Sequence, residues 1–142
     1  MNKSAPVVEI RYLHNPFGGI EVLRGINLTV ERGQTVSILG SSGSGKSTML
    51  RCINWLEVPD AGEIYLGGDR MGLKPDSLKP MSNRELAAMR ARTAMVFQGF
   101  NLWPHLTVLQ NVTEAPIHVM GVNRKEANEQ AAALLDKVGL SH

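Results

Sequence analysis

The sequence predicts an α/β fold, and three observations carry that prediction. Residues 34–39 form a nearly continuous apolar run rich in β-branched side chains, which is typical of a central parallel strand. This run leads directly into a glycine-rich loop at residues 40–48, and apolar side chains at helical spacing then predict a helix over residues 46–56. A second apolar, β-branched run at residues 93–97 predicts another buried strand.

Strand signals also surround this centre. Residues 7–13 read as a first strand, and residues 14–19 read as a loop because they contain Pro16 and a glycine pair. Residues 21–30 alternate apolar and polar side chains, as a half-buried strand does. A Pro-Asp-Ala-Gly turn then precedes a short strand at residues 63–66.

The second half of the sequence is richer in helix signals. Residues 82–85 read Ser-Asn-Arg-Glu, a capping box that opens a helix to about residue 91. Residues 108–113 predict a short helix, which we expect Pro116 to end. A cap at residues 123–126 opens a last helix that Gly139 stops, with one apolar face made by Ala127, Ala131, Leu134, Leu135 and Val138.

Composition excludes several classes of protein. The 142 residues are 43% hydrophobic and 20% charged, with a net charge of +2, which predicts neither a nucleic-acid partner nor a highly acidic binder. No apolar stretch approaches the length of a membrane span, and the N-terminus lacks the apolar core of a signal peptide. Cys52 is the single cysteine, so we expect a small buried side chain and no internal disulfide.

The loop at residues 40–48 reads G-S-S-G-S-G-K-S-T, the phosphate-loop pattern G-x-x-x-x-G-K-[ST]. Its glycines let successive backbone N–H groups point inward at a polyphosphate. Lys46 supplies a mobile ammonium for the β- and γ-phosphates, and the Ser47 hydroxyl is placed to hold Mg²⁺. The positive end of the helix dipole faces the same phosphates. A flexible Gly/Ser linker would need neither the Lys-Ser-Thr ending nor the flanking strand and helix.

A second stretch follows the buried run at residues 93–97. It begins with Gln98, and a polar residue at the carboxyl end of a strand lies where ligands bind in α/β sheets. A neutral amide there can ligate Mg²⁺ through its oxygen or orient a water molecule. Taken alone this is a weak signal, because a glutamine at a strand end is solvent-exposed by default.

The two motifs together resemble the ATP-binding subunits of ABC transporters. The resemblance covers residues 8–140, and it rests on E-V-L-R-G-I-N-L (21–28), the phosphate loop, R-C-I-N-W-L-E-V-P-D-A-G-E-I (51–64) and V-F-Q-G-F-N-L-W-P-H-L-T-V-L-Q-N-V (96–112). The last two stretches look most like the branch that serves polar amino-acid importers in bacteria. Gly99 departs from that branch, in which a polar residue more commonly follows the glutamine.

The resemblance implies roles for individual residues. Gln98 would touch Mg²⁺ and the attacking water, and Phe17 would stack on adenine. Trp103 and His105 lie in the segment that faces the membrane subunit, although a solvated loop histidine remains an equal reading of His105. The residues that would wrap the triphosphate and Mg²⁺ are Gly40, Ser42, Gly43, Gly45, Lys46, Ser47 and Thr48.

The resemblance also implies a fold and a biological setting. The expected fold is a P-loop NTPase core with a RecA-like parallel sheet and an N-terminal antiparallel β portion at residues 1–98, then the start of a helical subdomain at 99–142. The expected function is that of the ATPase subunit of a bacterial amino-acid importer, using ATP and Mg²⁺. It would bind permease subunits through residues 99–112, pair with a second ATPase subunit, and sit peripherally on the cytoplasmic face of the plasma (inner) membrane.

Some motifs of that family do not occur in these 142 residues. No apolar run ending in Asp-Glu follows Gln98, no L-S-G-G-Q-like signature is present, and no switch histidine stands in the expected place. We therefore expect a C-terminally truncated subunit that hydrolyses ATP poorly alone. A non-hydrolysing nucleotide-binding fragment and an ABC ATPase for another cargo remain alternatives, and a small-molecule kinase gives no account of residues 96–112. The sequence does not reveal the cargo.

Overall fold

The structure is a computed structural model that describes residues 5–17, 20–75 and 77–140. The chain divides into two compact units, Met1–Met95 and Val96–His142, and each is described by itself. No helix within the described ranges is long and apolar enough to cross a membrane.

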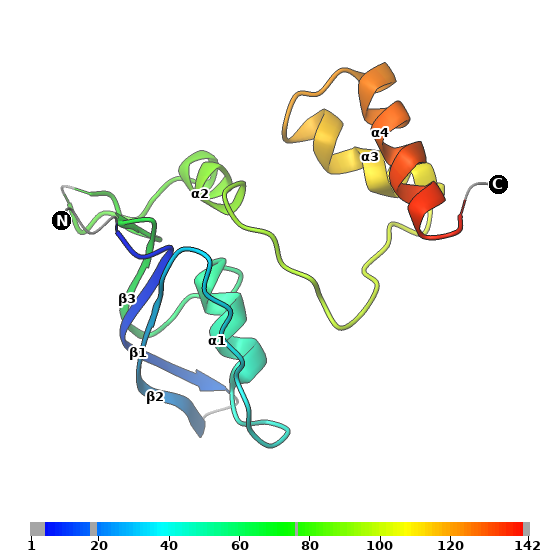
Figure 1. The fold of residues 1–142 in the computed structure, drawn as a ribbon. Helices are drawn as coiled ribbons and strands as arrows, with labels where there is room; N and C mark the ends of the chain where they lie inside the picture. Colours follow the sequence, from blue (N-terminus) through cyan, green and yellow to red (C-terminus); the bar gives the residue numbers. More distant parts are fainter. Residues whose placement is uncertain (1–4, 18–19, 76, 141–142) are drawn as a thin grey trace. The chain divides into compact units, whose positions relative to one another are not determined.

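The first unit is built on a four-stranded antiparallel sheet in the order β2-β1-β3-β4 (Figure 1). The strands are β1 (Val8–Phe17), β2 (Ile20–Val30), β3 (Ala61–Leu66) and β4 (Asp69–Arg70). β1 lies in the middle, so that Val8 faces Val30 of β2 on one side and Leu66 of β3 on the other. This sheet is the antiparallel β portion that the resemblance implied.

The predicted loop at residues 14–19 is wrong for residues 14–17, because β1 continues through Pro16 to Phe17. The pairing of β1 with β3 ends at His14, whereas its pairing with β2 continues to Phe17. Pro16 therefore lies where β1 needs no backbone donor on the β3 side, and a register irregularity falls between Asn15 and Pro16. Proline is tolerated at such an edge position.

The core of the first unit lies between this sheet and α1 (Lys46–Ile53). Met49 and Cys52 bring the helix into the core, and α1 is shorter than the predicted 46–56. Met71 and Met89 join them from the following segments. The buried sheet residues of the cluster are Ile10, Leu13, Leu23, Ile64 and Leu66.

Burial sets the chemistry of Cys52. Its side chain is 0% exposed, and the loss of solvent around it raises the pKa of the thiol to about 11. We expect a thiol reagent to label native Cys52 far more slowly than the unfolded chain.

Because the folded-state pKa of Cys52 lies above the ordinary value of 9.0, the stability conferred by the buried neutral thiol is fully present below about pH 9. It falls as the pH rises toward about 11. A Cys52→Ala variant should lose that alkaline dependence in urea titrations, and an unchanged dependence would contradict the assignment.

The C-terminal end of α1 departs from the usual residue choice. Leu56 N–H donates to Arg51 O at 2.9 Å and Trp55 N–H donates to Cys52 O at 2.9 Å, the two bonds of a Schellman cap. The residue in the left-handed conformation is Trp55, with φ of +54°, where glycine is the common choice. A non-glycine residue there costs about 1–2 kcal/mol. The Trp55 ring packs so tightly against Gly72 that a Cβ on Gly72 would overlap it.

The two buried strands predicted at residues 34–39 and 93–97 are not formed. Both segments are irregular, and Leu39 and Val96 are 92% and 97% exposed. All strand pairs among the described residues are antiparallel pairs of β1 to β4, so neither segment pairs with a neighbouring strand. A parallel strand forms only beside a partner, which apolar composition alone does not supply.

Helix α2 (Asn83–Arg90) closes the first unit and begins at the predicted capping box, in which Ser82 Oγ accepts from Glu85 N–H. A carboxylate oxygen of Glu85 accepts in turn from Ser82 N–H at 2.7 Å. These backbone and side-chain bonds from Ser82 lower the pKa of Glu85. The prediction of this helix start is confirmed.

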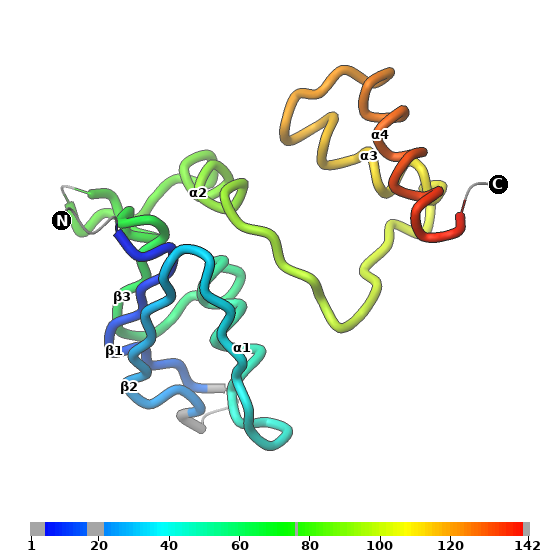
Figure 2. Tube along the Cα trace, in the orientation of Figure 1, coloured from blue at the N-terminus to red at the C-terminus, as the bar shows by residue number. Residues whose placement is uncertain are grey.

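The second unit holds α3 (Val108–His118) and α4 (Arg124–Lys137). The prediction that Pro116 ends α3 is wrong, because one proline removes a single N–H and the helix continues to a cap at Val119. The predicted apolar face of α4 is wrong in part. Ala127 and Ala131 are buried, but Leu134 and Val138 are 55% and 69% exposed. In the tube view the chain between α2 and α3 follows no helix or strand (Figure 2).

Candidate phosphate-binding site

The phosphate loop joins residues 34–39 to the N-terminus of α1. Ser44 N–H donates to Ser41 O at 3.3 Å and so closes a turn inside the loop. Gly43 and Gly45 take φ of +78° and +88°, a region that glycine enters without steric cost. Gly45 is also the N-cap of α1. The predicted glycines therefore stand where the backbone turns.

Close packing adds a second requirement at two of the glycines. A Cβ on Gly45 would lie 2.9 Å from Leu23 Cδ2 and 3.2 Å from Val22 O, both on β2. A Cβ on Gly40 would lie 2.7 Å from Ser44 Oγ. A side chain at Gly45 would press on β2, and one at Gly40 would require Ser44 to move, so both glycines keep the loop close-packed.

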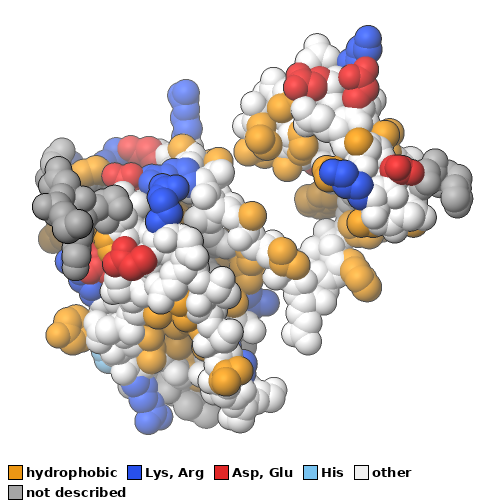
Figure 3. Space-filling view, viewed as in Figure 1, with side chains coloured by type: hydrophobic (Ala, Val, Ile, Leu, Met, Phe, Trp, Pro, Cys, Tyr) orange, Lys and Arg blue, Asp and Glu red, His pale blue; other side chains and the backbone are white. Residues whose placement is uncertain are grey.

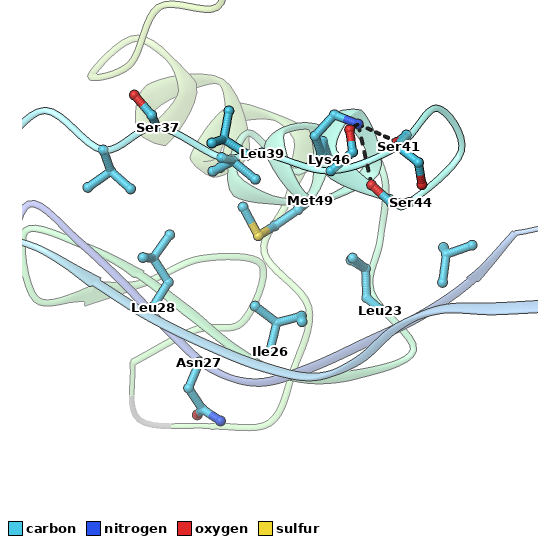
Figure 4. Close-up of a pocket in the computed structure, with 15 residues that line it drawn as sticks. Leu23, Ile26, Asn27, Leu28, Ser37, Leu39, Ser41, Ser44, Lys46 and Met49 are labelled. Atoms are coloured by element: carbon cyan, nitrogen blue, oxygen red, sulfur yellow. Dashed lines mark hydrogen bonds between the residues drawn. The ribbon is translucent and has the colours of Figure 1, made fainter.

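The Lys46 ammonium lies inside the loop that carries it. Its Nζ donates to Ser41 O at 2.6 Å, to Gly40 O at 2.9 Å and to Ser44 Oγ at 3.3 Å, two of which Figure 4 shows as dashed lines. The cation is thus held at the loop by neutral acceptors and adds positive charge there. Residue type and spacing predict no role for Ser44, because its contact with Lys46 depends on how the loop closes.

The N-terminus of α1 meets the conditions for binding an anion. The first N–H groups of a helix have no partner within it, and no described side chain caps them here. The first turn reads Lys-Ser-Thr-Met, without a carboxylate. A cavity of about 140 Å³ opens at this point, lined by Val22 and by Gly43, Ser44, Gly45, Lys46, Ser47 and Thr48. Phosphate groups suit such unpaired N–H groups at the positive end of a helix.

The residues present also suit Mg²⁺ held together with a phosphate. Ser47 is exposed beside the loop, so its hydroxyl can reach a bound ion. No group of three or more His, Cys, Asp or Glu side chains gathers to hold a metal within the part of the chain that the structure describes. A magnesium ion bound to a nucleotide needs only one or two protein ligands, since phosphate oxygens and water complete its shell.

A larger groove of about 560 Å³ lies on the sheet side of the loop (Figure 4). Its walls are mostly apolar side chains of β2, α1 and residues 36–39, among them Leu23, Leu28 and Met49. It exists because residues 34–39 run beside the sheet without pairing to it. Its apolar lining does not suit a polyphosphate, so the smaller cavity is the candidate site.

The structure describes some predicted site residues only in part. Ser42 is exposed within the loop. The backbone of Phe17 ends β1, but its side chain lies outside the described part, so its role toward adenine stays a prediction. Gln98 is exposed and belongs to the second unit, so its role toward Mg²⁺ also stays a prediction.

In the second unit the loop before α3 is organised by Asn111, a residue that the sequence analysis gave no role. Asn111 Oδ1 accepts from Trp103 N–H at 2.8 Å, and its Nδ2 donates to the carbonyl oxygens of Trp103, Leu106 and Thr107. Trp103 stays 57% exposed, and its ring meets the His105 ring edge-on with centroids 6.0 Å apart. Phe100 and Leu102 are 93% and 62% exposed. Figure 3 shows apolar side chains at the surface of each unit.

Comparison with known proteins agrees with this geometry. Residues 23–142 match the family described as ABC transporter. The chain is 52% identical over 138 residues to the arginine/ornithine transport ATP-binding protein AotP of Pseudomonas aeruginosa, covering 95% of this chain and 54% of that protein. It is 50% identical over 131 residues to the histidine/lysine/arginine/ornithine transport ATP-binding protein HisP of Salmonella typhimurium, covering 90% and 51%. The chain spans about half the length of the curated relatives it matches.

Solved structures give the same family. The bacterial ABC transporter cassette MJ0796, solved as a dimer, matches with a TM-score of 0.74 at 34% identity, covering 91% of this chain and 56% of the cassette. A dimeric post-hydrolysis state of the same cassette bound to ADP and Pi matches with a TM-score of 0.73. These matches confirm the predicted α/β fold class, including its phosphate-loop core. With its phosphate loop at the head of α1 and a family match over residues 23–142, the chain belongs to the ABC transporter family of ATP-binding proteins.

Proposed function

We propose that this chain binds Mg–ATP as part of the ATPase subunit of a bacterial amino-acid importer. One observation carries the proposal: an uncapped helix N-terminus at which Gly43, Gly45 and Lys46 form a narrow, positively charged loop. The names of the most similar relatives, which describe transport of arginine, ornithine and histidine, support the choice of amino acids as cargo.

Each loop residue has a distinct role in this proposal. The N–H groups of residues 43–48 hold phosphate oxygens, and Lys46 exchanges its loop carbonyls for the β- and γ-phosphates. The Ser47 hydroxyl would hold Mg²⁺, which would supply positive charge against the phosphates. Gly40 and Ser42 would help to wrap the triphosphate, and Thr48 lines the cavity beside Ser47 in the first turn of α1.

Gln98 supplies the remaining polar group in the proposal. Its amide oxygen would act as a magnesium ligand and orient the attacking water, without adding charge to a site already crowded with phosphates. The exposed segment that follows, residues 99–112, would contact the permease subunits through apolar side chains such as Trp103. Pairing with a second ATPase subunit and attachment to the cytoplasmic face of the membrane belong to the same proposal.

Two measurements test this function. Calorimetry should detect binding of ATP and ADP in the presence of Mg²⁺, and no binding of either would overturn the nucleotide assignment. Uptake of radiolabelled arginine, ornithine and histidine should fall in cells that lack this gene and return when it is restored. Unchanged uptake of all three would remove the cargo assignment while leaving the nucleotide assignment intact.

Phe17 provides a test of adenine recognition. Phe17→Ala should weaken ATP binding, because stacking of an aromatic ring on a base is worth about 1–3 kcal/mol. Binding of inorganic triphosphate should stay nearly unchanged, since it has no base to stack. Parallel weakening of both ligands, or of neither, would make Phe17 a structural residue.

A further inference from the structure

The C-terminal end of α1 is held by a side chain from another helix. Arg90, the last residue of α2, donates from Nε to Asn54 O at 3.0 Å and from Nη2 to Trp55 O at 2.7 Å. Carbonyl groups at a helix C-terminus have no partner within the helix, and a cation there also complements the helix dipole. Arg90 therefore supplies both hydrogen bonds and charge at this end of α1.

A second contact ties the same point to the chain that follows α2. Thr93 Oγ1 lies 2.6 Å from Asn54 Oδ1 and 3.2 Å from Arg90 O. Thr93 N–H also donates to Arg90 O at 3.0 Å. Asn54, Arg90 and Thr93 thus form one joint between the end of α1 and the end of α2.

This joint acts on a helix end that contains a residue in a strained backbone conformation. Trp55 holds the left-handed conformation of the Schellman cap, and its ring packs against Gly72. Because Arg90 binds the carbonyl of Trp55 itself, it fixes the strained residue as well as the helix end.

We infer that Arg90 is a positioning residue for the phosphate loop. Helix α1 has eight residues, so it is about 12 Å long and moves as a rigid rod. A tilt that frees its C-terminal end also displaces its N-terminal end, where Lys46 and Ser47 begin the helix. Arg90 therefore sets the position of both side chains without touching a ligand. This inference rests on the proposed nucleotide site.

Arg92 offers a matched control, because it lies two residues away and makes contacts of the same kind on a different element. Its Nη1 donates to Asp69 Oδ2 at 2.6 Å and its Nη2 donates to Leu66 O at 2.9 Å, which ties α2 to the β3–β4 hairpin. Neither contact involves α1. Loss of Arg92 removes side-chain bonds to the sheet, whereas loss of Arg90 removes side-chain bonds to the end of α1, the helix that carries Lys46.

The test compares Arg90→Met, Arg90→Lys, Arg92→Met and Lys46→Ala in this chain. Melting temperatures give the stability of each variant, and calorimetry with Mg–ATP well below every melting temperature gives the affinity. We expect Arg90→Met to weaken binding about three- to thirtyfold. Arg90→Lys, which keeps the charge but carries its donors on a single nitrogen, should recover part of the loss. Arg92→Met should bind as wild type although it is also destabilised.

The outcomes separate the inference from the proposed function. Two results would overturn the positioning role, provided that Lys46→Ala still weakens Mg–ATP binding. One is wild-type affinity in Arg90→Met, and the other is a loss of affinity in Arg92→Met equal to that in Arg90→Met. Wild-type affinity in Lys46→Ala would overturn the nucleotide site itself. If Arg90→Met does not fold, Thr93→Val removes one bond of the same joint, and it should weaken binding in the same direction by a smaller factor. Unchanged binding in a folded Thr93→Val would then count against the inference.

Discussion

Replacing Lys46 by alanine is expected to weaken Mg–ATP binding about ten- to a hundredfold, because a charge-assisted hydrogen bond contributes about 1.5–3 kcal/mol. In the structure the Lys46 ammonium has only neutral oxygen partners in the loop, Gly40 O, Ser41 O and Ser44 Oγ. A phosphate oxygen is a stronger partner for the same cation. Calorimetry of the variant beside the wild type measures the difference directly.

Lys79→Ala is the matched control for this change, since it removes one lysine from an exposed position outside the loop. It should bind Mg–ATP as wild type does. Equal affinity of wild type and Lys46→Ala would mean that nucleotide does not bind at this loop. Equal losses in both variants would mean that the effect reports net charge and not the contact of Lys46 with phosphate.

Gly45→Ala is expected to damage both the loop and the fold. Its φ of +88° is strained for alanine by about 1–2 kcal/mol. Its Cβ would press on Leu23 and on the carbonyl of Val22, and overpacking of this kind costs about 1–3 kcal/mol. Because Gly45 caps α1, relief of these contacts must move the helix N-terminus. Urea unfolding should show the loss of stability, and Mg–ATP affinity should fall with it.

Gly33→Ala separates the two causes. Gly33 has a similar φ of +78°, but a Cβ there would meet nothing within 4 Å. Gly33→Ala should therefore lose only the stability that corresponds to backbone strain, and its affinity for Mg–ATP should equal that of the wild type. If Gly45→Ala were no less stable than Gly33→Ala, the packing of the loop against β2 would not be the constraint described above.

The parts of the fold that local sequence signals encode were predictable. The phosphate loop and the capping box at Ser82 depend on residues close together in the chain, and so do the apolar patterns that mark the individual strands β1, β2 and β3. The two parallel strands were not, because a strand at residues 34–39 needs a neighbour that no described residue supplies. Apolar composition marks a segment that can become a buried strand, and pairing decides whether it does.

Arg90, Trp55 and Asn111 make contacts that residue type and spacing do not reveal. Arg90 meets Asn54 and Trp55, which precede it by more than thirty positions. The left-handed conformation of Trp55 is not marked by a glycine, and its ring contact with Gly72 joins positions seventeen residues apart. Asn111 reads as an ordinary helix residue until its bonds to the loop at Trp103 are seen.

The central claim is that polyphosphate binds to the backbone N–H groups of residues 43–48, and amide NMR tests it most directly. On addition of Mg²⁺ with ATP or with inorganic triphosphate, the amide signals of these residues should shift in proportion to the bound fraction, and adenosine alone should leave them in place. Shifts confined to other residues, with the amides of residues 43–48 unmoved at saturating ATP, would contradict the claim.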